Sequence, residues 1–444
     1  MLPGLAQALS ESVSPLYSDF VPTLNKIGTA LSRSHHTPPA DPALRRLRIA
    51  LTVFFAVDGF LFAGWVVRIP AIKAQVGASA GQLGLALLGV SAGAVATMLL
   101  TGRLCRVFGS DRVTVATGVL LSLSIALPPR THSALALGLV LLCFGISYGG
   151  LNVAMNSVAV DLVAALRRPV MSSFHAAYSM GGLLGSAIGG LLAPHLSPAT
   201  HLLLLTPVGL VAVAVAGRVL LAQPLHRPTG PRPAEGPAPS PASASARTRR
   251  TAPATAGRGG RTGLLVAVFG LIAACTAYGE GALAEWGPLH IQQDLHGGPG
   301  IAAAGYSAVT LAMTLGRLSG TALLERLGQT RALVLGGLTA CAGMLVAALS
   351  PSLVLVMAGF ALTGLGLANL FPTAIARAGE LTGPGGVAAA STFGYGGMLL
   401  GPPSIGFLTD AFGLPTALTT VAALAAVAAL IAYSVRNSGV RQEG

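Results

Sequence analysis

The sequence predicts an all-α membrane protein with twelve transmembrane helices in two six-helix pseudo-repeats. The chain is 53% hydrophobic and only 9% charged, whereas soluble domains carry about 25% charged residues. Apolar runs long enough to cross a bilayer follow one another along the chain. Landmarks of the first half also return, in the same order, in the second half. These three observations together exclude an ordinary soluble protein.

The predicted spans follow from the length of each apolar run. The first extends over residues 49–67, between Arg48 and Arg68. At about 1.5 Å per residue it is about 28 Å long, close to the hydrocarbon thickness of a bilayer. The twelve predicted ranges are 49–67, 82–102, 113–128, 134–160, 170–193, 200–221, 263–286, 300–321, 332–349, 352–376, 387–408 and 414–435.

The spans group into two bundles, 45–222 and 262–436, that a polar segment joins. Residues 223–261 are rich in Pro, Ala, Ser, Gly and Arg, a composition that cannot bury a core and is typical of a flexible linker. Residues 1–44 are expected to form a disordered cytoplasmic tail or a segment lying on the membrane surface, and residues 437–444 a C-terminal tail. No basic stretch followed by an apolar core marks the N-terminus as a signal peptide.

The basic residues predict the orientation in the membrane. If the N-terminus is cytoplasmic, only Arg68, Lys73 and Arg130 fall outside, and every other Lys and Arg falls inside. Cytoplasmic loops carry an excess of Lys and Arg, so both termini are expected in the cytoplasm. The dominance of Arg over Lys, with abundant Ala, Gly and Pro, indicates a GC-rich bacterial genome, so the expected location is the bacterial plasma membrane. Because the net charge of +13 is concentrated at helix ends and in the linker, we do not expect nucleic-acid binding.

The two halves share residues at matching positions. The pair Asp58-Gly59 precedes Trp65, and Glu280-Gly281 precedes Trp286. The same interval separates two Asn–Tyr pairs, one in each half. The remaining matches are Gly102-Arg103-Leu104 with Gly316-Arg317-Leu318, Asn152 with Asn369, and Tyr178 with Tyr395.

Two six-helix repeats around a long linker resemble the major facilitator superfamily. The run from Gly102 to Arg112 is similar to the signature turn between helices 2 and 3 of that family. The resemblance implies that this turn and its counterpart in the second half form a conformational latch. The implied latch residues are Gly102, Arg103, Gly109, Asp111, Arg112, Arg317, Glu325 and Arg326. Because Arg106 stands where the family has an acid, the latch is expected to use Asp111 or to be weaker.

The superfamily resemblance covers about 46–436. Within it, the runs Gly149–Asn156 and Arg168–Ser179 look like the fucose-permease-related, MosC-like branch. That branch does not fix a substrate.

Asp58 is the central residue of the first span. A charged carboxylate at this depth is costly unless it faces a partner or water, and such residues usually have a function. No Lys or Arg is expected near its depth, so the carboxyl is expected to hold a proton and to release it when water reaches it. Asp58 is therefore predicted to couple transport to protons; the alternative is a part in an internal polar network.

Four polar residues are predicted at the same depth as Asp58, about 12–15 Å from the cytoplasmic edge. They are Asn152, Tyr178, Asn369 and Tyr395. Since substrate sites of this fold lie near the midplane between the halves, these residues are predicted to bind substrate. Interhelical hydrogen bonding is the competing interpretation for them.

Asn156 and His175 are expected one turn nearer the cytoplasm. Asn156 shares a helix face with Asn152 and is assigned to the substrate site. His175 is a candidate proton relay, because its unperturbed pKa is near neutrality; a hydrogen bond to a neighbouring helix is the alternative.

Glu280 and Glu285 lie late in the predicted span 263–286. Counting residues from its start places Glu280 in an outer vestibule, as a further proton-coupling candidate, and Glu285 at the surface. The repeat instead pairs Glu280 with Asp58, which disagrees with this depth.

The predicted function is secondary active transport of a small molecule by alternating access, driven by protons. A sugar, polyol or related polar metabolite is the favoured substrate; efflux of drugs or natural products and a non-transporting sensor are the alternatives. Enzyme motifs, metal-ligand spacings and phosphate-binding loops are absent from the sequence, so no cofactor or metal is expected. The expected partners are the substrate, protons and membrane lipid, and the expected state is a monomer.

Overall fold

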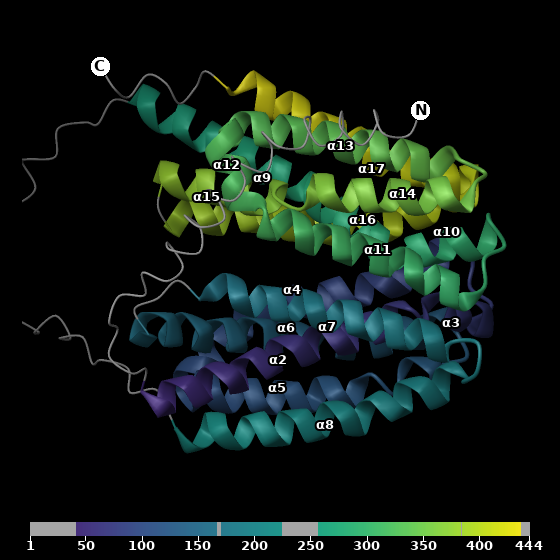
Figure 1. The fold of residues 1–444 in the computed structure, drawn as a ribbon, viewed down its shortest axis with the longest axis horizontal. Coiled ribbons are helices and arrows are strands. Elements are labelled where there is room, and N and C mark those ends of the chain that lie inside the picture. Colours follow the sequence, from purple (N-terminus) through teal and green to yellow (C-terminus); the bar gives the residue numbers. More distant parts are fainter. Residues whose placement is uncertain (1–40, 167–169, 224–255, 383, 437–444) are drawn as a thin grey trace, which may run out of the picture. The chain divides into compact units, whose positions relative to one another are not determined.

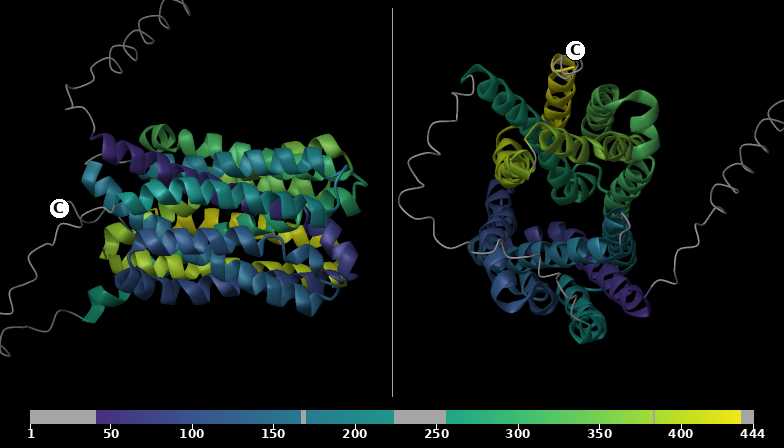
Figure 2. Two further views of the ribbon diagram at one scale, coloured as in Figure 1. Left: turned by 90° about the horizontal axis from the view of Figure 1, so that it is seen from below. Right: turned by 90° about the vertical axis from the view of Figure 1, so that its left-hand side faces the viewer.

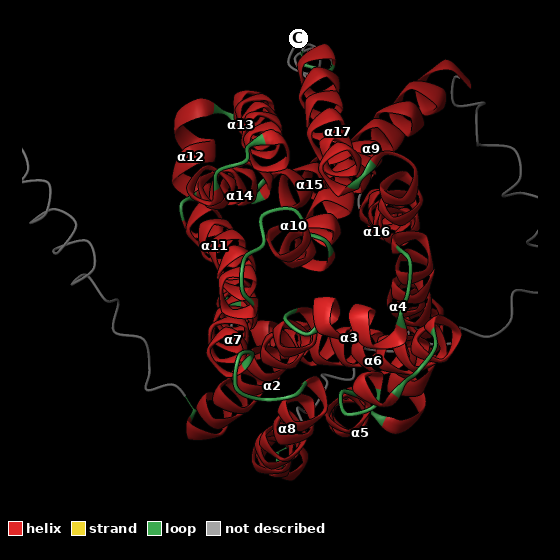
Figure 3. Cartoon of the chain, turned by 90° about the vertical axis from the view of Figure 1, so that its right-hand side faces the viewer, coloured by secondary structure: helices red, strands yellow, loops and turns green. Residues whose placement is uncertain are grey.

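The computed structural model describes residues 41–166, 170–223, 256–382 and 384–436. All regular elements in these ranges are helices, as Figure 3 shows. Residues from Arg46 onward form one compact unit. The predicted tails and most of the predicted linker lie outside the described residues. A helix begins at Ala256, inside the predicted linker, while the candidate membrane span begins at Thr262; the domain bounds stay a prediction.

In the described residues, the first half contains seven α-helices and one short 3-10 turn (Figure 1). Their bounds are α2 Pro42–Val66, α3 Ile69–Val76, α4 Ala80–Phe108, α5 Ser110–Ser124, η1 Pro128–Arg130, α6 Ala134–Leu166, α7 Met171–Leu192 and α8 Pro198–Ala222.

The second half divides its predicted spans more often. Its helices are α9 Ala256–Glu285, α10 Gly287–Gln293, α11 Pro299–Leu318, α12 Gly320–Leu327, α13 Gln329–Leu349, α14 Leu353–Leu367, α15 Leu370–Thr382, α16 Pro384–Phe412 and α17 Leu414–Ser434. The predicted span 352–376 is thus two helices, which meet at Ala368 and Asn369.

Among the described residues, 10 helical segments are long and apolar enough to cross a membrane. Helices α7 and α16 occupy the places of the predicted spans 170–193 and 387–408. The chain is therefore an integral membrane protein with an all-α fold.

The two halves repeat the same packing. In the first half α6 packs on α4 and α5, and α8 packs on α5; in the second half α14 packs on α11 and α13, and α17 packs on α13. Each half also joins its first and fifth spans closely. A Cβ on Gly181 of α7 would overlap the Ala56 carbonyl of α2, and one on Gly397 of α16 would overlap the Ala274 carbonyl of α9. The repeat seen in the sequence is therefore a repeat of structure.

Two turns in equivalent positions need glycine. Gly109, between α4 and α5, has φ 92°, and Gly328, between α12 and α13, has φ 75°. Residues with a side chain rarely adopt this region. Both predicted latch turns thus reverse the chain through a glycine.

The halves lie side by side in Figure 1, and the right-hand view of Figure 2 shows the same division. We call the end at which α8 ends and α9 begins the linker end, and the opposite end the distal end. Three helix pairs join the halves: α4 with α16, α7 with α11, and α3 with α10. The short helices α3 and α10 lie near the centre of the distal end (Figure 3).

The distal segment of the first half is fixed by a buried arginine. Arg68, between α2 and α3, is 2% exposed. Its Nε donates to His201 Nδ1 at 2.8 Å, and its Nη1 to the Ala193 carbonyl at 3.3 Å. Burial lowers the pKa of the Arg68 guanidinium to about 10, so the group is still charged at neutral pH. It joins the α2–α3 corner to α7 and α8.

Candidate functional site

Asp58 is an ionisable group that is fully buried and has no hydrogen-bond partner among the described residues. Its side chain is 0% exposed, and neither carboxyl oxygen has a hydrogen-bond partner. Helix α2 brings it against α7, because a Cβ on the next residue, Gly59, would overlap the Tyr178 carbonyl. A buried charged carboxylate without partners is very costly. The site therefore holds a group whose charge depends on access to water or to another ligand.

Two tyrosines of the same half, Tyr148 of α6 and Tyr178 of α7, lie within electrostatic range of Asp58. Their hydroxyl oxygens are 2.9 Å apart and share a hydrogen bond. Phe62 of α2 stacks on the Tyr148 ring, with centroids 5.2 Å apart. The carboxyl thus adjoins a paired set of phenol groups.

Two more tyrosines approach this pair from the second half. Tyr306 of α11 and Tyr395 of α16 lie within electrostatic range of Tyr148. Tyr395 is 36% exposed, and the other three are partly exposed. We call Tyr148, Tyr178, Tyr306 and Tyr395 the tyrosine cluster. Its four hydroxyls come two from each half, and each can donate and accept a hydrogen bond.

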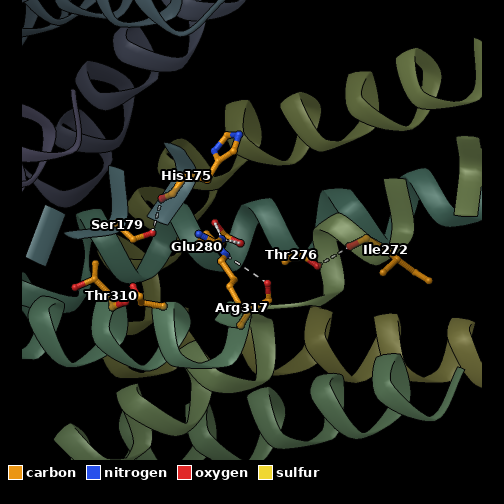
Figure 4. Close-up of polar contacts among 9 residues, drawn as sticks. His175, Ser179, Ile272, Thr276, Glu280, Thr310 and Arg317 are labelled. Atoms are coloured by element: carbon orange, nitrogen blue, oxygen red, sulfur yellow. Dashed lines mark hydrogen bonds and ion pairs between the residues drawn. The ribbon is translucent and has the colours of Figure 1, made fainter. Parts of the chain in front are cut away.

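An ion pair lies on the second-half side of this cluster. Arg317 Nη2 of α11 lies 3.2 Å from Glu280 Oε1 and 3.3 Å from Oε2 of α9. Figure 4 shows the two side chains facing each other. Both charges act on Tyr306. The outer vestibule predicted for Glu280 was therefore wrong: Glu280 meets a residue predicted for the cytoplasmic latch.

The depth of Glu280 was counted from Gly263 as the start of the span, but α9 already begins at Ala256, and the segment continues beyond Glu285. Trp286 makes a short corner, and α10 continues the segment to Gln293. Glu280 is therefore well inside the combined segment, at the position that the repeat assigns to it.

Arg317 also supports a helix break. Its Nε donates to the Ala368 carbonyl at 3.4 Å, and Asn369 Nδ2 donates to the Gly316 carbonyl at 2.8 Å. Ala368 and Asn369 separate α14 from α15. A break inside a membrane leaves backbone groups that need new partners, and the end of α11 supplies them. Asn369 is thus held by α11, and its predicted contact with substrate stays a prediction.

His175, the predicted proton relay, belongs to the first half. It lies on α7, is exposed, and is within electrostatic range of Arg317. Its ring packs edge-on against Phe55, with centroids 5.4 Å apart. In Figure 4 its ring lies apart from the Glu280–Arg317 pair and points away from it. Its predicted role as a proton relay therefore stays a prediction.

The two asparagines of α6 bond to each other. Asn156 Nδ2 donates to the Asn152 carbonyl at 2.8 Å and to Asn152 Oδ1 at 3.3 Å. This contact confirms that they share one helix face. Both are partly exposed, and their predicted binding role stays a prediction.

The burial of Glu285 differs most from its prediction. Glu285 was expected at the surface, yet it is 7% exposed and its Oε2 has no partner among the described residues. The adjacent Trp286 Nε1 is also unpartnered. Glu285 acts electrostatically on Tyr306, so the second half brings a buried carboxyl to the cluster as well.

Tyr148 and Tyr306 were missed altogether. Tyr148 precedes Asn152 by one helical turn and shares its face. Tyr306 lies about three turns before Arg317 on α11, also on one face. Each is a tyrosine within an apolar span, and a buried tyrosine hydroxyl usually needs a hydrogen-bond partner. That feature could have identified both residues as candidates for a polar site.

The remaining predicted latch residues stay at the linker end. Gly102 and Arg103 end α4, Asp111 and Arg112 begin α5, and Glu325 and Arg326 close α12. Only Arg317 leaves this group for the centre. Their latch role stays a prediction.

Comparison with known proteins agrees with this architecture. The family model described as Major Facilitator Superfamily matches residues 49–334 and 269–443. An MFS-type transporter of Yersinia pestis is 30% identical over 409 residues, which cover 91% of this chain and 100% of that protein. Membrane protein MosC of Rhizobium meliloti is 29% identical over 398 residues, which cover 89% of this chain and 90% of MosC.

Solved structures show the same fold at low identity. The nucleoside transporter NupG has a TM-score of 0.64 at 13% identity, covering 87% of this chain and 98% of NupG. A bacterial homologue of the lysosomal transporter Spinster has a TM-score of 0.68 at 14% identity, covering 89% of this chain and 97% of the homologue. A D-xylose–proton symporter has a TM-score of 0.65 at 13% identity, covering 87% of this chain and 97% of the symporter.

Proposed function

Because the chain belongs to the major facilitator superfamily and is a membrane transporter rather than an enzyme, we propose that it moves a small polar molecule by alternating access and couples this movement to protons. The observation that carries the proposal is Asp58, a fully buried carboxyl without a partner beside a cluster built from both halves. A group of this kind changes its charge when the surrounding water changes. Alternating access provides such a change.

The tyrosine cluster supports an uncharged, hydroxyl-rich substrate. Its phenols offer donors and acceptors without a charge, and Phe62 adds an apolar face beside Tyr148. Mostly apolar sites with a few placed polar groups are typical of small-molecule binding. Arg317, a cation within electrostatic range of Tyr306, is already paired with Glu280, which disfavours a simple anion. A sugar, a polyol or a related metabolite fits this chemistry.

The names of two solved neighbours agree with that class. One is a nucleoside transporter and another a D-xylose–proton symporter. At 13% identity they share the fold alone, so they support the substrate class only as an analogy. Orientation with both termini in the cytoplasm rests on the distribution of basic residues.

Efflux of drugs or natural products is the second candidate. The stack of Phe62, Tyr148 and Phe144, with centroid distances of 5.2 and 6.4 Å, offers flat apolar surface that a lipophilic cation could use, and Asp58 would supply the opposite charge.

A ligand screen by thermal stability separates the candidates. The purified protein would be melted with sugars, polyols, nucleosides and lipophilic cations at about pH 6 and about pH 8. A ligand that binds only the folded protein raises the melting temperature. We expect a sugar or polyol to do so, and the same compound to accumulate in proteoliposomes under an acid-outside gradient. Stabilisation by cations alone would favour efflux, and no flux of any compound would leave the sensor hypothesis.

A further inference from the structure

The contact between α4 and α16 ends in a carboxylate at the distal end. Asp410 lies in the last turn of α16, and three donors from the first half reach it. Ser79 Oγ donates to Oδ2 at 2.9 Å, the Ala80 amide to Oδ1 at 3.0 Å and the Gly81 amide to Oδ2 at 2.8 Å. The two helices belong to different halves of the molecule. One side chain thus bridges the halves with three hydrogen bonds.

The two amides are those that a helix cannot satisfy by itself. The first N–H groups of any helix have no intrahelical partner. Ser79 already caps α4 by accepting from the Gln82 amide at 3.2 Å, and this leaves the Ala80 and Gly81 amides to Asp410. The second half therefore completes the cap of a first-half helix.

The negative charge of Asp410 interacts favourably with the N-terminus of α4 and unfavourably with the C-terminus of its own helix, α16. A negative charge is stabilising near a helix N-terminus and destabilising near a C-terminus. Asp410 lies near the C-terminus of α16, which ends at Phe412, and at the N-terminus of α4. Its position is favourable only while the two halves touch.

The rest of this contact is close backbone packing. A Cβ on Gly84 would overlap the Pro402 carbonyl, and Ser91 Oγ donates to the Met398 carbonyl at 3.3 Å. In the other long contact between the halves, α7 with α11, Ser186 and Ser307 share a hydrogen bond of 2.7 Å between neutral groups. The α4–α16 contact thus includes three hydrogen bonds to a charged group.

We propose that Asp410 and the first turn of α4 form a distal latch, which holds the distal end closed and thereby sets the balance between the two access states. The inference rests on the proposed alternating access. If the halves separate at the distal end, all three hydrogen bonds break, two amides lose their partner, and the Asp410 charge is left at the end of its own helix. Asp410 is a positioning residue, since it is remote from the tyrosine cluster.

Hydrogen exchange at neutral pH tests the latch directly, because the Ala80 and Gly81 amides are themselves the donors. We expect Asp410→Asn to speed exchange in the peptides around residues 79–84 about tenfold, since hydrogen bonds to charged groups are the stronger ones. Ser79→Ala, which removes one of the three bonds, should give a smaller increase. Asp410→Glu, which keeps the charge, should restore most of the protection.

Asp294→Asn is the matched control. Asp294 also lies near the distal end, but it bonds within its own half, to His290 Nδ1 at 2.8 Å. It should leave exchange at 79–84 unchanged. Unchanged exchange in both Asp410→Asn and Ser79→Ala would overturn the latch, and so would an increase spread over the whole chain, which indicates a merely structural role.

The readout does not depend on flux. Selective exchange without transport of any compound would leave the latch standing and remove the proposed function. Transport with unchanged exchange would do the reverse.

Discussion

Asp58 and Glu280 occupy equivalent places in the two halves and have opposite environments. Asp58 is fully buried, and neither of its oxygens has a partner. Glu280 is partly exposed and accepts two contacts from Arg317. The same fold and the same position in the repeat thus hold one isolated carboxyl and one paired carboxylate.

The difference originates in the helix that faces each carboxyl. Arg103 is the sequence counterpart of Arg317, but it stays exposed near the end of α4 and does not reach Asp58. In the second half the break at Ala368 offers a carbonyl that fixes Arg317. In the first half α6 runs unbroken past Asn152. The second half thus combines a broken helix with an ion pair, whereas in the first half the helix is unbroken and Asp58 has no partner.

The largest expected effect is that of Asp58→Asn. Asparagine keeps the size of the side chain and removes its titration, so uptake against a gradient should fall more than about tenfold, whereas exchange of substrate without a gradient should persist. Proton-driven accumulation in proteoliposomes measures the first and counterflow the second. Glu280→Gln is the matched control and should retain its response to a pH gradient. A variant of Asp58 that accumulates substrate like the wild type would refute proton coupling at this residue.

The second-largest effect concerns the glycines that follow the two carboxyls, because substituting them should change the stability of the protein to different extents. A Cβ on Gly59 would overlap the Tyr178 carbonyl, whereas a Cβ on Gly281 meets nothing within 4 Å. Gly59→Ala should therefore destabilise the protein by about 1–3 kcal/mol, as overpacking does. Gly281→Ala should be neutral or stabilising by up to about 1 kcal/mol, because alanine favours helix. Melting temperatures in detergent give both values, and equal effects would mean that α2 does not pack on α7 as described.

The sequence predicted the architecture better than the neighbourhoods of single residues. Long apolar runs and the distribution of arginines depend only on the bilayer, so the spans and the repeat could be predicted before any contact was known. Asp58 was found because a charge in an apolar span is rare. These features need no knowledge of the partner helix.

Contacts between helices could not be predicted in the same way. The depth of Glu280 was misjudged because it was counted from the start of the predicted span, and such a count does not show which helix faces the residue. Arg317 was assigned to a surface turn, since the sequence does not show that its side chain reaches back to α9. The bridge from Asp410 to α4 joins residues from different halves, and no spacing along the chain indicates it.

The ion pair should contribute less to stability than its place suggests. The side chains of Arg317 and Glu280 are 38% and 32% exposed, and water screens pairs of this kind to about 1 kcal/mol or less. Arg317→Gln should cost somewhat more than Glu280→Gln, because it also removes the donor to the Ala368 carbonyl. A double-mutant cycle on unfolding isolates the pair. A coupling energy well above this range would show a drier site than the structure describes.

The smallest effect expected at neutral pH concerns Asp410, a second-half carboxylate that accepts three hydrogen bonds. Slight burial acts to raise the pKa of Asp410, but hydrogen bonds from Gly81, Ser79 and Ala80, with the nearby charge of Lys73, outweigh it and lower the pKa. Asp410 lies beyond the predicted span 387–408, at the distal end. Its pKa is lower when bonded than when free, so its contribution is complete above the ordinary aspartate range, near 4, and is lost as the pH falls through the lowered value. The difference in melting temperature between the wild type and Asp410→Asn should therefore stay constant from about pH 8 to about pH 5 and shrink only in stronger acid. A difference that already declines near pH 6 would show that Asp410 is not held as a bonded anion, and Asp410 would then resemble the isolated Asp58 more than the paired Glu280.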